Sequence, residues 1–384
     1  MLRSSLIAAL MVGAWALTPA AHANPSVPAC TSLGAAVDAF GQKTLSKGAP
    51  GLVVAVDAPG RTPVITAFGL ADLEARAPMQ PQSVFKIASL TKQFTAAAVL
   101  ALAETGRVDL DRPVADYLPD QSFAGQITVR QLLIQTAGLA DYAETLARDG
   151  TKSVRRTPDQ MAAVIAELKP LQTFRPGEAW TYSNSNYVLL GLLIEKVTGA
   201  SYGDFLHTRI LERAGMTASA VDRMEDIVPM RVRGYSRAGR SPLQLRNADW
   251  IDPSVPGAAG SMRATASDLL AWSRALFEGR IVSRQSLELM TSPGRLSDGR
   301  TTREGMPQAW REGLQADYAM GLFRSASPLG ARLWHTGDID GFSVWMARYP
   351  EKDMTLVVLM NADFLDLDTA SLEAAVAAEG CAPG

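Results

Sequence analysis

Residues 89–100 read SLTKQFTAAAVL, a serine and a lysine at the start of an alanine-rich helical stretch. In a helix that begins at Ser89, the side chain of Lys92 lies one turn away on the same face, within reach of the serine hydroxyl. A serine hydroxyl is a weak nucleophile at neutral pH, and a neighbouring amine activates it by accepting its proton. The N–H groups and the dipole at a helix N-terminus also favour negative charge. The pattern therefore predicts a helix over 89–105 that carries a nucleophilic serine.

Two other serines compete for the role of nucleophile. Ser83 stands three residues before Lys86, but in a proline-flanked stretch that offers no helix to align the pair. Ser201 lies in a Gly-x-Ser-x-Gly sequence, which fits the nucleophile elbow of α/β-hydrolases. That elbow needs a strand before the serine, whereas residues 187–197 fit a helix that ends in glycine. Ser201 is therefore predicted to cap the next helix, and Ser89 is the favoured nucleophile.

The chain contains three histidines, and their positions separate them. His22 lies in the N-terminal leader described below. His207 falls within a helical pattern among apolar residues, which predicts a structural role. His335 stands in Leu-Trp-His-Thr-Gly, at the end of a predicted strand and before a turn. By itself, His335 carries no specific chemistry.

Apolar patterning divides the chain into ends that form strands and a middle that forms helices. The pattern predicts strands at 51–56, 64–68, 318–324, 331–336, 342–349 and 354–361, and further helices at 33–45, 128–135, 158–168, 184–198, 202–213, 266–277 and 367–378. This order differs from the alternating strands and helices of a doubly wound parallel sheet. We expect an α/β (α+β) fold with one sheet built from about 30–80 and 318–384, and a mainly helical region over about 89–280 inserted between its halves.

The N-terminal residues predict export. Arg3 precedes an apolar run over 6–17, and a small-residue site, Ala21-His-Ala23, follows it. This is the pattern of a secretory signal peptide, residues 1–23, which leaves a mature domain of 24–384 in the periplasm or outside the cell. No later stretch reaches the roughly 18 apolar residues that a membrane-spanning helix needs.

The two cysteines, Cys30 and Cys381, lie near the two ends of the mature chain. An oxidising compartment permits them to pair, and the termini of a domain are often close together. We expect a disulfide between them, with two unpaired thiols as the alternative.

The composition and the motifs limit the kinds of partner that this protein is expected to bind. The chain has 37 basic and 39 acidic residues and a net charge of −2, without a basic block among aromatic residues, so nucleic acid is not an expected partner. No metal-ligand spacing and no phosphate-binding glycine loop with a lysine occurs, so neither a metal nor a cofactor is expected. A small-molecule or peptide substrate remains, and the oligomeric state stays open.

A further element is Tyr182-Ser-Asn184, at the start of the helix expected over 184–198. Taken alone, Asn184 reads as a helix cap and Tyr182 as a packing residue. In chain order, however, Ser89-x-x-Lys92, Tyr182-Ser-Asn184 and His335-Thr-Gly resemble the three signature elements of the serine β-lactamase and penicillin-binding protein superfamily. The Tyr-x-Asn element is similar to that of the branch that holds class C β-lactamases, DD-carboxypeptidases, D-aminopeptidases and related esterases.

The resemblance covers most of the mature chain. Matching framework segments occur at 85–88, 132–133, 137–139, 190–191, 215–217, 257–260 and 268–269. It implies an antiparallel sheet formed from both termini with flanking helices, an all-helical region, and an active site between them. That arrangement agrees with the order of elements expected above.

The resemblance also implies a role for each motif residue. Ser89 is the nucleophile that becomes acylated, and Lys92 and Tyr182 transfer protons with it. The lysine and the tyrosine titrate as a coupled unit, so neither alone is assigned as the base. Asn184 is expected to orient the substrate amide or Lys92.

The third motif is implied to bind the substrate along its strand, through Thr336 and Gly337. The oxyanion hole is implied to consist of the backbone N–H groups of Ser89 and Asp338. Losing one such donor typically costs about 10²–10³ in rate.

Two departures from the family pattern bear on the substrate. His335 replaces the lysine of class C β-lactamases, and because histidine titrates near neutrality we expect activity to change in one direction across roughly pH 5–8. Asp338, with Asp340 close behind, stands where relatives often have small neutral residues. An aspartate there would repel the carboxylate that β-lactams and DD-peptides present.

The expected function is therefore a serine hydrolase that cleaves esters or amides through an acyl-enzyme, of the esterase or D-amino-acid peptidase type, with weak or no β-lactamase activity. The alternatives are a DD-carboxypeptidase or class C-like β-lactamase, and a non-catalytic penicillin-binding sensor.

Overall fold

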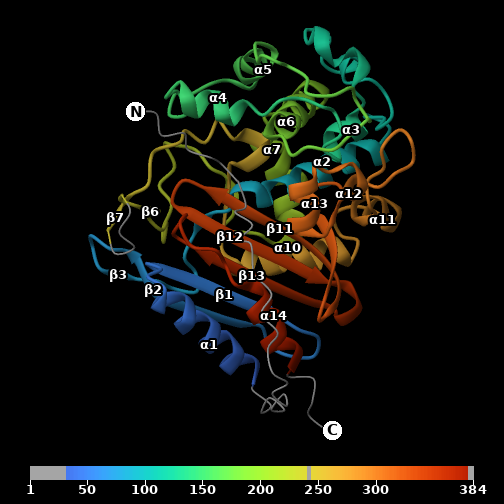
Figure 1. Cartoon of the computed structure of the whole chain (residues 1–384). Helices are drawn as coiled ribbons and strands as arrows, with labels where there is room; N and C mark the ends of the chain where they lie inside the picture. The colour runs from blue at the N-terminus through green and yellow to red at the C-terminus, as the bar shows by residue number, and fades with distance from the viewer. Residues whose placement is uncertain (1–31, 240–243, 379–384) are drawn as a thin grey trace.

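The computed structural model describes residues 32–239 and 244–378. Its main feature is an eight-stranded sheet whose strands pair in the order β3-β2-β1-β13-β12-β11-β10-β9 (Figure 1). The strands are β1 (Gly51–Asp57), β2 (Val64–Asp72), β3 (Ala77–Pro78), β9 (Asp317–Tyr318), β10 (Phe323–Ser327), β11 (Gly330–Ile339), β12 (Phe342–Tyr349) and β13 (Met354–Met360). Each neighbouring pair among them is antiparallel, which confirms the expected fold class.

The two ends of the chain meet at β1. This strand pairs with β2 on one side, the predicted hairpin, and with β13 on the other, in a register that runs from Leu52 opposite Met360 to Asp57 opposite Thr355. Every residue of β1 is buried. The sheet is therefore assembled from both termini, as the sequence predicted.

Helices cover both faces of the sheet, which explains why residues 356–360 of β13 are an unbroken apolar run. Successive side chains of a strand point to opposite faces. Leu356 and Val358 of β13 belong to a core with α1 (Leu33–Ser46) and α14 (Thr369–Ala378), whereas Val357 belongs to the core shared with the helical region. Figure 1 shows α1 and α14 side by side on one face, and α10 (Ala266–Phe277) contacts β1 and β13 from the other.

The inserted region is mainly helical. Its other helices are α2 (Thr91–Glu104), α3 (Val129–Leu133), α4 (Tyr142–Arg148), α5 (Pro158–Ala166), α6 (Asn184–Thr198), α7 (Tyr202–Leu206), α8 (Glu212–Ala214), α9 (Gly257–Gly260), α11 (Arg284–Thr291), α12 (Thr302–Gly305) and α13 (Gln308–Leu314). Short strands form two smaller sheets, β4 (Phe85–Lys86) with β8 (Met262–Ala264) and β5 (Ala220–Val221), and β6 (Tyr235–Arg237) with β7 (Leu245–Asn247).

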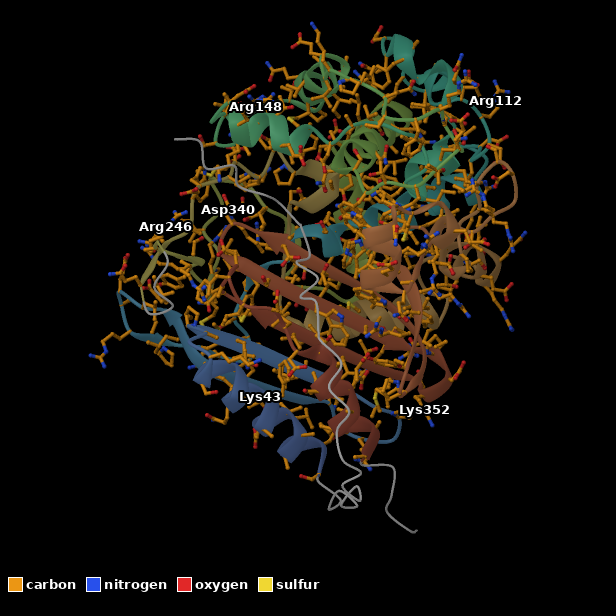
Figure 2. The ribbon with its side chains drawn as sticks, viewed as in Figure 1. Lys43, Arg112, Arg148, Arg246, Asp340 and Lys352 are labelled. Carbon is orange, nitrogen blue, oxygen red and sulfur yellow. The ribbon has the colours of Figure 1, made fainter. Side chains whose placement is uncertain are left out.

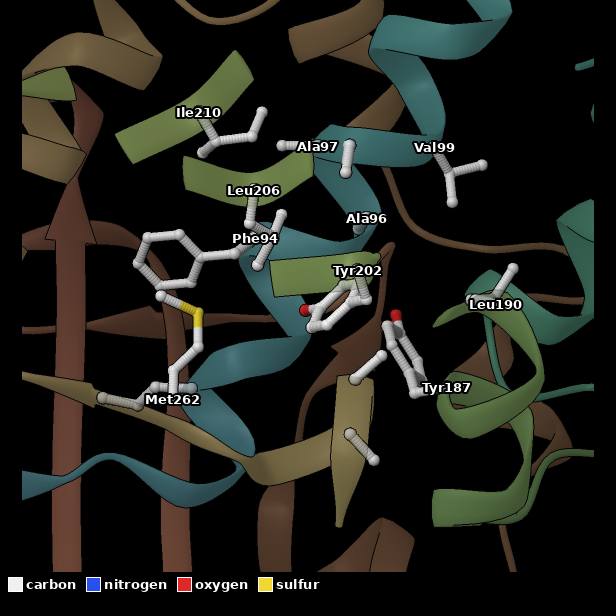
Figure 3. Packing of buried hydrophobic residues seen from close by; sticks show 14 of the residues in the cluster. Phe94, Ala96, Ala97, Val99, Tyr187, Leu190, Tyr202, Leu206, Ile210 and Met262 are labelled. Carbon is white, nitrogen blue, oxygen red and sulfur yellow. The ribbon is translucent and has the colours of Figure 1, made fainter. Parts of the chain in front are cut away.

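Helix α2 lies at the centre of this region and is buried on all sides over most of its length. A helix that is apolar all round belongs in a core. The small side chains of Ala96 and Ala97 let α6, α7 and α9 approach α2 closely, and Figure 3 shows Tyr202 and Leu206 of α7 packed around it. Because α2 is held rigidly, the turn before it is also fixed in position.

Several expected elements differ in extent. The helix predicted over 89–105 begins at Thr91, after a separate turn that holds Ser89, and a turn of π-helix over 207–211 interrupts the helix predicted over 202–213. The strand predicted over 64–68 extends to Asp72.

The strand predicted over 318–324 is two strands, β9 and β10, because Gly321 turns between them at a φ of 76°. A Cβ at Gly321 would lie 2.6 Å from the carbonyl oxygen of Lys92, so this turn packs directly on α2. The helix predicted over 128–135 ends earlier, at Leu133. Strand β11 continues to Ile339, so His335 lies inside a strand rather than at its end.

Candidate active site

The nucleophile candidate Ser89 lies in a tight turn, a single turn of 3₁₀-helix over Ala88–Leu90, that leads into α2. Ala88 has a φ of 45°, in the left-handed region that non-glycine residues seldom adopt. Such a backbone conformation costs about 1–3 kcal/mol and is found mostly where surrounding structure enforces it, often at active sites. The turn leaves Ser89 half-buried, while Ala88 and Leu90 on either side are buried.

Strand β11 is pressed against this turn at Gly337. A Cβ at position 337 would lie 2.4 Å from the carbonyl oxygen of Ile87 and 3.2 Å from the Cβ of Ala88. Only glycine fits there without displacing the strand. The close approach places the third motif beside the nucleophile turn.

The Ser89 hydroxyl has two polar neighbours, Lys92 from the first motif and Tyr182 from the second. The Nζ atom of Lys92 lies 3.0 Å from Ser89 Oγ, and the hydroxyl of Tyr182 donates to the same oxygen over 2.9 Å. The lysine Nζ also lies 4.8 Å from the centre of the Tyr182 ring. The structure therefore brings the three side chains together although 90 residues separate Lys92 from Tyr182.

Lys92 is fully buried, with 0% of its surface exposed. Its Nζ donates to Asn184 Oδ1 and to the carbonyl oxygen of Ala259 in α9, each over 2.8 Å. Burial lowers the pKa of Lys92 from its usual 10.5 to about 7. A neutral amine has two N–H donors and one lone pair. With both donors taken by these oxygens, the lone pair points toward the Ser89 hydroxyl.

Tyr182 behaves differently from Lys92. Burial, together with the nearby Tyr318, raises the pKa of Tyr182 well above its usual value of 10. The phenol therefore stays protonated at neutral pH, and it serves Ser89 as a hydrogen-bond donor. Lys92 and Tyr182 therefore differ in protonation: the amine of Lys92 loses its proton readily, whereas the phenol of Tyr182 keeps its proton.

Asn184 is the first residue of α6, and it joins Lys92 to Asp141, a residue that belongs to none of the three motifs. Its Nδ2 donates to Asp141 Oδ2 over 2.8 Å, while its Oδ1 faces Lys92. Asp141 precedes α4 and caps it by accepting the backbone N–H of Ala143. The sequence signal was an aspartate before a helix, which is a common cap and gives no hint of a second role.

His335 lies in β11, and 2% of its surface is exposed. Its ring lies 6.0 Å from that of Tyr182 between centres and packs also on Tyr318 and Phe323. Burial, with the adjacent charge of Lys92, lowers the pKa of His335 to about 3. The expectation that His335 titrates between pH 5 and 8 is therefore wrong, because the apolar surroundings disfavour the imidazolium throughout that range.

The residues after His335 alternate along β11. Thr336 is half-buried, Gly337 is buried against the nucleophile turn, and Asp338 is exposed. The pKa of Asp338 is raised by partial desolvation and by two other carboxylates, Asp366 and Asp363. Three carboxyl groups, those of Asp338, Asp363 and Asp366, thus lie near one another immediately beyond the motif.

Asp340, two residues further on, is neutralised. It forms an ion pair with Lys152, from the loop between α4 and α5, and that lysine also contacts Asp249. Figure 2 labels Asp340 at the end of β11. This pair joins the loop over 149–157 to the turn that follows β11, so these two segments lie side by side.

The competing residues have other partners. Ser83 is buried and accepts the backbone N–H of Gln80, while Lys86 lies over the ring of Trp250. Ser201 caps α7, as expected.

His207 is exposed beside Glu212 rather than packed in the core, which corrects its expected structural role. The segment 207–211 is a wide turn of π-helix that places this side chain outside.

Some predicted features lie outside the described residues, namely the signal peptide over 1–23 and both Cys30 and Cys381. Within the two described ranges, no helix is long and apolar enough to cross a membrane. The same residues contain no group of three or more His, Cys, Asp or Glu side chains that could hold a metal ion.

Known proteins show the same architecture. A D-stereospecific amidohydrolase from a Streptomyces species superposes with a TM-score of 0.75 and 29% identity over 91% of this chain and 98% of its own. A D-amino acid amidase from Ochrobactrum anthropi SV3, in complex with L-phenylalanine amide, gives a TM-score of 0.74 and 26% identity over 90% of this chain and 97% of its own.

Among curated proteins, a penicillin-binding protein of Bacillus subtilis (strain 168) is 30% identical over 77% of this chain and 65% of its own length. Protein flp of Staphylococcus aureus (strain N315) is 28% identical over 85% of this chain and 62% of its own length. The chain thus spans a little under two thirds of the length of these relatives.

The family model described as Beta-lactamase matches residues 33–379, which is most of the chain. The match includes all three motifs and both halves of the sheet. The chain therefore belongs to the Beta-lactamase family, and the resemblance to serine β-lactamases and penicillin-binding proteins is confirmed.

Proposed function

We propose that this protein is a serine hydrolase that cleaves amide or ester bonds through an acyl-enzyme on Ser89. The observation that carries the proposal is the pair of contacts at one oxygen, with Lys92 Nζ at 3.0 Å and the Tyr182 hydroxyl at 2.9 Å from Ser89 Oγ. A buried amine with a pKa of about 7 is a suitable general base at neutral pH.

In the acylation step, Ser89 Oγ attacks the substrate carbonyl carbon while Lys92 Nζ accepts the serine proton. The Tyr182 hydroxyl gives its proton to the departing nitrogen or oxygen and regains one from Lys92. The carbon–leaving-group bond breaks, and the acyl group stays on Ser89. A water molecule then attacks the ester carbonyl carbon, and its proton passes to the same pair of side chains. The bond between that carbon and Ser89 Oγ breaks, the pair returns the proton to Oγ, and the acyl group leaves as a carboxylic acid.

The developing oxyanion is assigned to the backbone N–H groups of Ser89 and Asp338. The close approach of Gly337 to Ile87 and Ala88 supports this assignment, because it brings the strand beside the turn. Fixed N–H donors in such a site stabilise the transition state without reorganisation. Thr336 and Gly337 would line the bound substrate along β11.

The proposed substrates are esters, or amides that carry no carboxylate next to Asp338. The exposed Asp338 has two further carboxylates nearby, whereas Asp340 is already paired with Lys152. Like charge disfavours a ligand carboxylate at this position. The similarity to a D-stereospecific amidohydrolase and a D-amino acid amidase supports amides of D-amino acids as the first class to test.

A substrate panel tests the proposal. The purified protein is given p-nitrophenyl acetate and butyrate, a D-aminoacyl anilide, a peptide ending in D-Ala-D-Ala and a chromogenic cephalosporin. We expect turnover of the esters or the anilide to exceed turnover of the cephalosporin and the peptide. Faster cephalosporin or peptide cleavage would instead favour a β-lactamase or DD-carboxypeptidase, and a stable adduct without turnover would favour a sensor.

A further inference from the structure

We propose that Asp141 is a positioning residue of this site: its carboxylate fixes the amide of Asn184 so that Lys92 directs its lone pair at Ser89. The inference rests on the proposed function, because it concerns how the base of that reaction is oriented. Asp141 does not touch Ser89, and it acts through two intervening side chains.

The first step is the contact between Asp141 and Asn184. Asp141 Oδ2 accepts both the backbone N–H of Asn184, over 3.2 Å, and its side-chain Nδ2, over 2.8 Å. The other carboxylate oxygen, Oδ1, accepts the backbone N–H of Ala143 over 2.9 Å. The carboxylate therefore joins the start of α4 to the start of α6, the helix that follows the second motif.

The charge of Asp141 fixes the orientation of the Asn184 side-chain amide. Burial raises the pKa of Asp141, but the hydrogen bonds described above for its carboxylate all come from N–H donors, and these, with the charge of Lys92, favour the ionised form. An ionised carboxylate only accepts hydrogen bonds, whereas an amide has one accepting and one donating end. The Nδ2 of Asn184 must therefore face Asp141, and its Oδ1 must face Lys92. A reversed amide would set the carboxylate against a carbonyl oxygen and the lysine Nζ against an NH₂ group.

The third step concerns Lys92. Asn184 Oδ1 and the carbonyl oxygen of Ala259 are both acceptors, and each takes one N–H of the amine over 2.8 Å. The remaining direction of the nitrogen is toward Ser89 Oγ, 3.0 Å away. If the Asn184 amide reversed, the lone pair of Lys92 would be drawn to the NH₂ group, and an N–H would face the serine instead.

Charge acts in the same chain of contacts. The groups that face Lys92 are the Tyr182 and Tyr187 rings, His335 and Asp141. His335 is neutral in this site, and both phenols keep their protons. Burial lowers the pKa of Lys92, and the charge of Asp141 opposes that effect. Removing this charge should therefore lower the pKa of Lys92 further.

The direction of that change separates positioning from a merely structural role. If Asp141 served only to hold α4 in place, its loss would loosen the region and admit water to Lys92. The pKa of Lys92 would then rise toward its usual value of 10.5. If Asp141 positions Asn184, the pKa of Lys92 should fall when the carboxylate is removed. If Asp141 only holds α4 in place, that pKa should rise.

The test uses the full-length protein and a fluorophosphonate probe, with the rate of Ser89 labelling measured from pH 5 to 10 and the labelled peptide identified by mass spectrometry. Asp141→Asn keeps the size of the side chain and a good helix cap. Asp268→Asn is the matched control, because Asp268 is also a carboxylate in the helical region that accepts a backbone N–H and a hydroxyl, those of Ala218 and Ser219.

We expect Asp141→Asn to lower the maximal labelling rate by about tenfold or more, since a positioned base contributes about 10²–10⁴ in rate. The acid limb of its pH profile should move to lower pH, while Asp268→Asn keeps the wild-type midpoint. An unchanged rate and midpoint, or a shift to higher pH, would overturn the inference. If Asp141→Asn does not fold, Asp141→Ser, which keeps a cap without the charge, gives the same comparison. Absence of wild-type labelling at Ser89 would refute the proposed function instead.

Discussion

Gly337 and Ile87 are in contact where strand β11 meets the nucleophile turn: a Cβ at Gly337 would lie 2.4 Å from the Ile87 carbonyl oxygen. It would also lie 2.7 Å from a methyl carbon of Val344 on the neighbouring strand. The strand has no direction in which to yield freely. The distance between the third motif and Ser89 therefore depends on the absence of a side chain at Gly337.

Gly337→Ala should reduce acylation far more than it reduces stability. The added methyl pushes β11 from the turn, and a displacement of about 1 Å at a reacting centre costs about 10² in rate. Steady-state kinetics with p-nitrophenyl butyrate, beside thermal unfolding, measures both effects. Gly313→Ala is the control, because Gly313 lies in α13 with no atom near its Cβ position and without a left-handed backbone. Equal activity of the two variants would contradict the close packing.

Lys92→Arg should lose about 10²–10⁴ in the acylation rate, the usual contribution of a general base. A guanidinium stays protonated and cannot accept the serine proton. Ser89→Ala should abolish labelling altogether. Both rates are measured with an active-site-directed fluorophosphonate, and Lys86→Arg serves as control because Lys86 lies over Trp250 rather than beside Ser89.

The pH profile of the wild-type protein should follow Lys92. Because the pKa of Lys92 is lowered to about 7, its base form is present above that pH and is lost as pH falls. We expect kcat/KM to drop about tenfold per pH unit below about pH 7 and to be level above it. The high pKa of Tyr182 leaves the alkaline side without a fall until beyond pH 10.

His335 should have little influence on this midpoint through its own titration, since burial holds its pKa at about 3. His335→Gln keeps a neutral polar side chain. The kcat/KM of this variant is compared with that of the wild type across pH 5 to 10, and the midpoint of the acid limb should stay within about half a pH unit of the wild-type value. Disappearance of the limb in this variant would assign the titration to the histidine.

Asp338→Asn should relax discrimination against anionic substrates. The substitution removes the charge and leaves the backbone N–H in place. The ratio of kcat/KM for a cephalosporin to that for p-nitrophenyl butyrate should rise by about tenfold, the effect of about 1.4 kcal/mol. Asp340→Asn is the control, since Asp340 is already paired with Lys152. An unchanged or lower ratio would mean that the charge of Asp338 does not repel the substrate.

Export and the disulfide can be checked on protein recovered from the medium or periplasm of an expression host. The intact mass should correspond to a chain that begins after Ala23. Alkylation before and after reduction should show Cys30 and Cys381 protected only before reduction. A full-length mass, or free thiols in the untreated protein, would contradict these two predictions.

Local patterns predicted the fold well, and they singled out the motif residues that the structure brings together. The hairpin of β1 and β2, the strands β12 and β13 and the helix α6 all carry periodic apolar residues, so short-range information was enough. The strand predicted over 318–324 was wrong in extent because Gly321 must pack against the carbonyl of Lys92, a contact between distant parts of the chain. Strand register and close contacts of this kind cannot be predicted from the local pattern of residues.

The electrostatics of the site could not be predicted in the same way. The sequence placed a histidine in the third motif, but its pKa depends on the Tyr182, Tyr318 and Phe323 rings that surround it in the folded chain. Asp141 was missed for a related reason. A helix cap is explained by its own helix, and only the fold reveals that the same carboxylate holds Asn184.

The most direct test of the account is the covalent intermediate itself. Wild-type protein is mixed with p-nitrophenyl butyrate, quenched in acid within the first turnovers, and analysed by intact mass and peptide mapping, beside Ser89→Ala and Ser83→Ala. We expect one butyryl group on the peptide that contains Ser89 in the wild type and in Ser83→Ala, and none in Ser89→Ala. A butyryl group on any other residue, or turnover by Ser89→Ala at the wild-type rate, would contradict it.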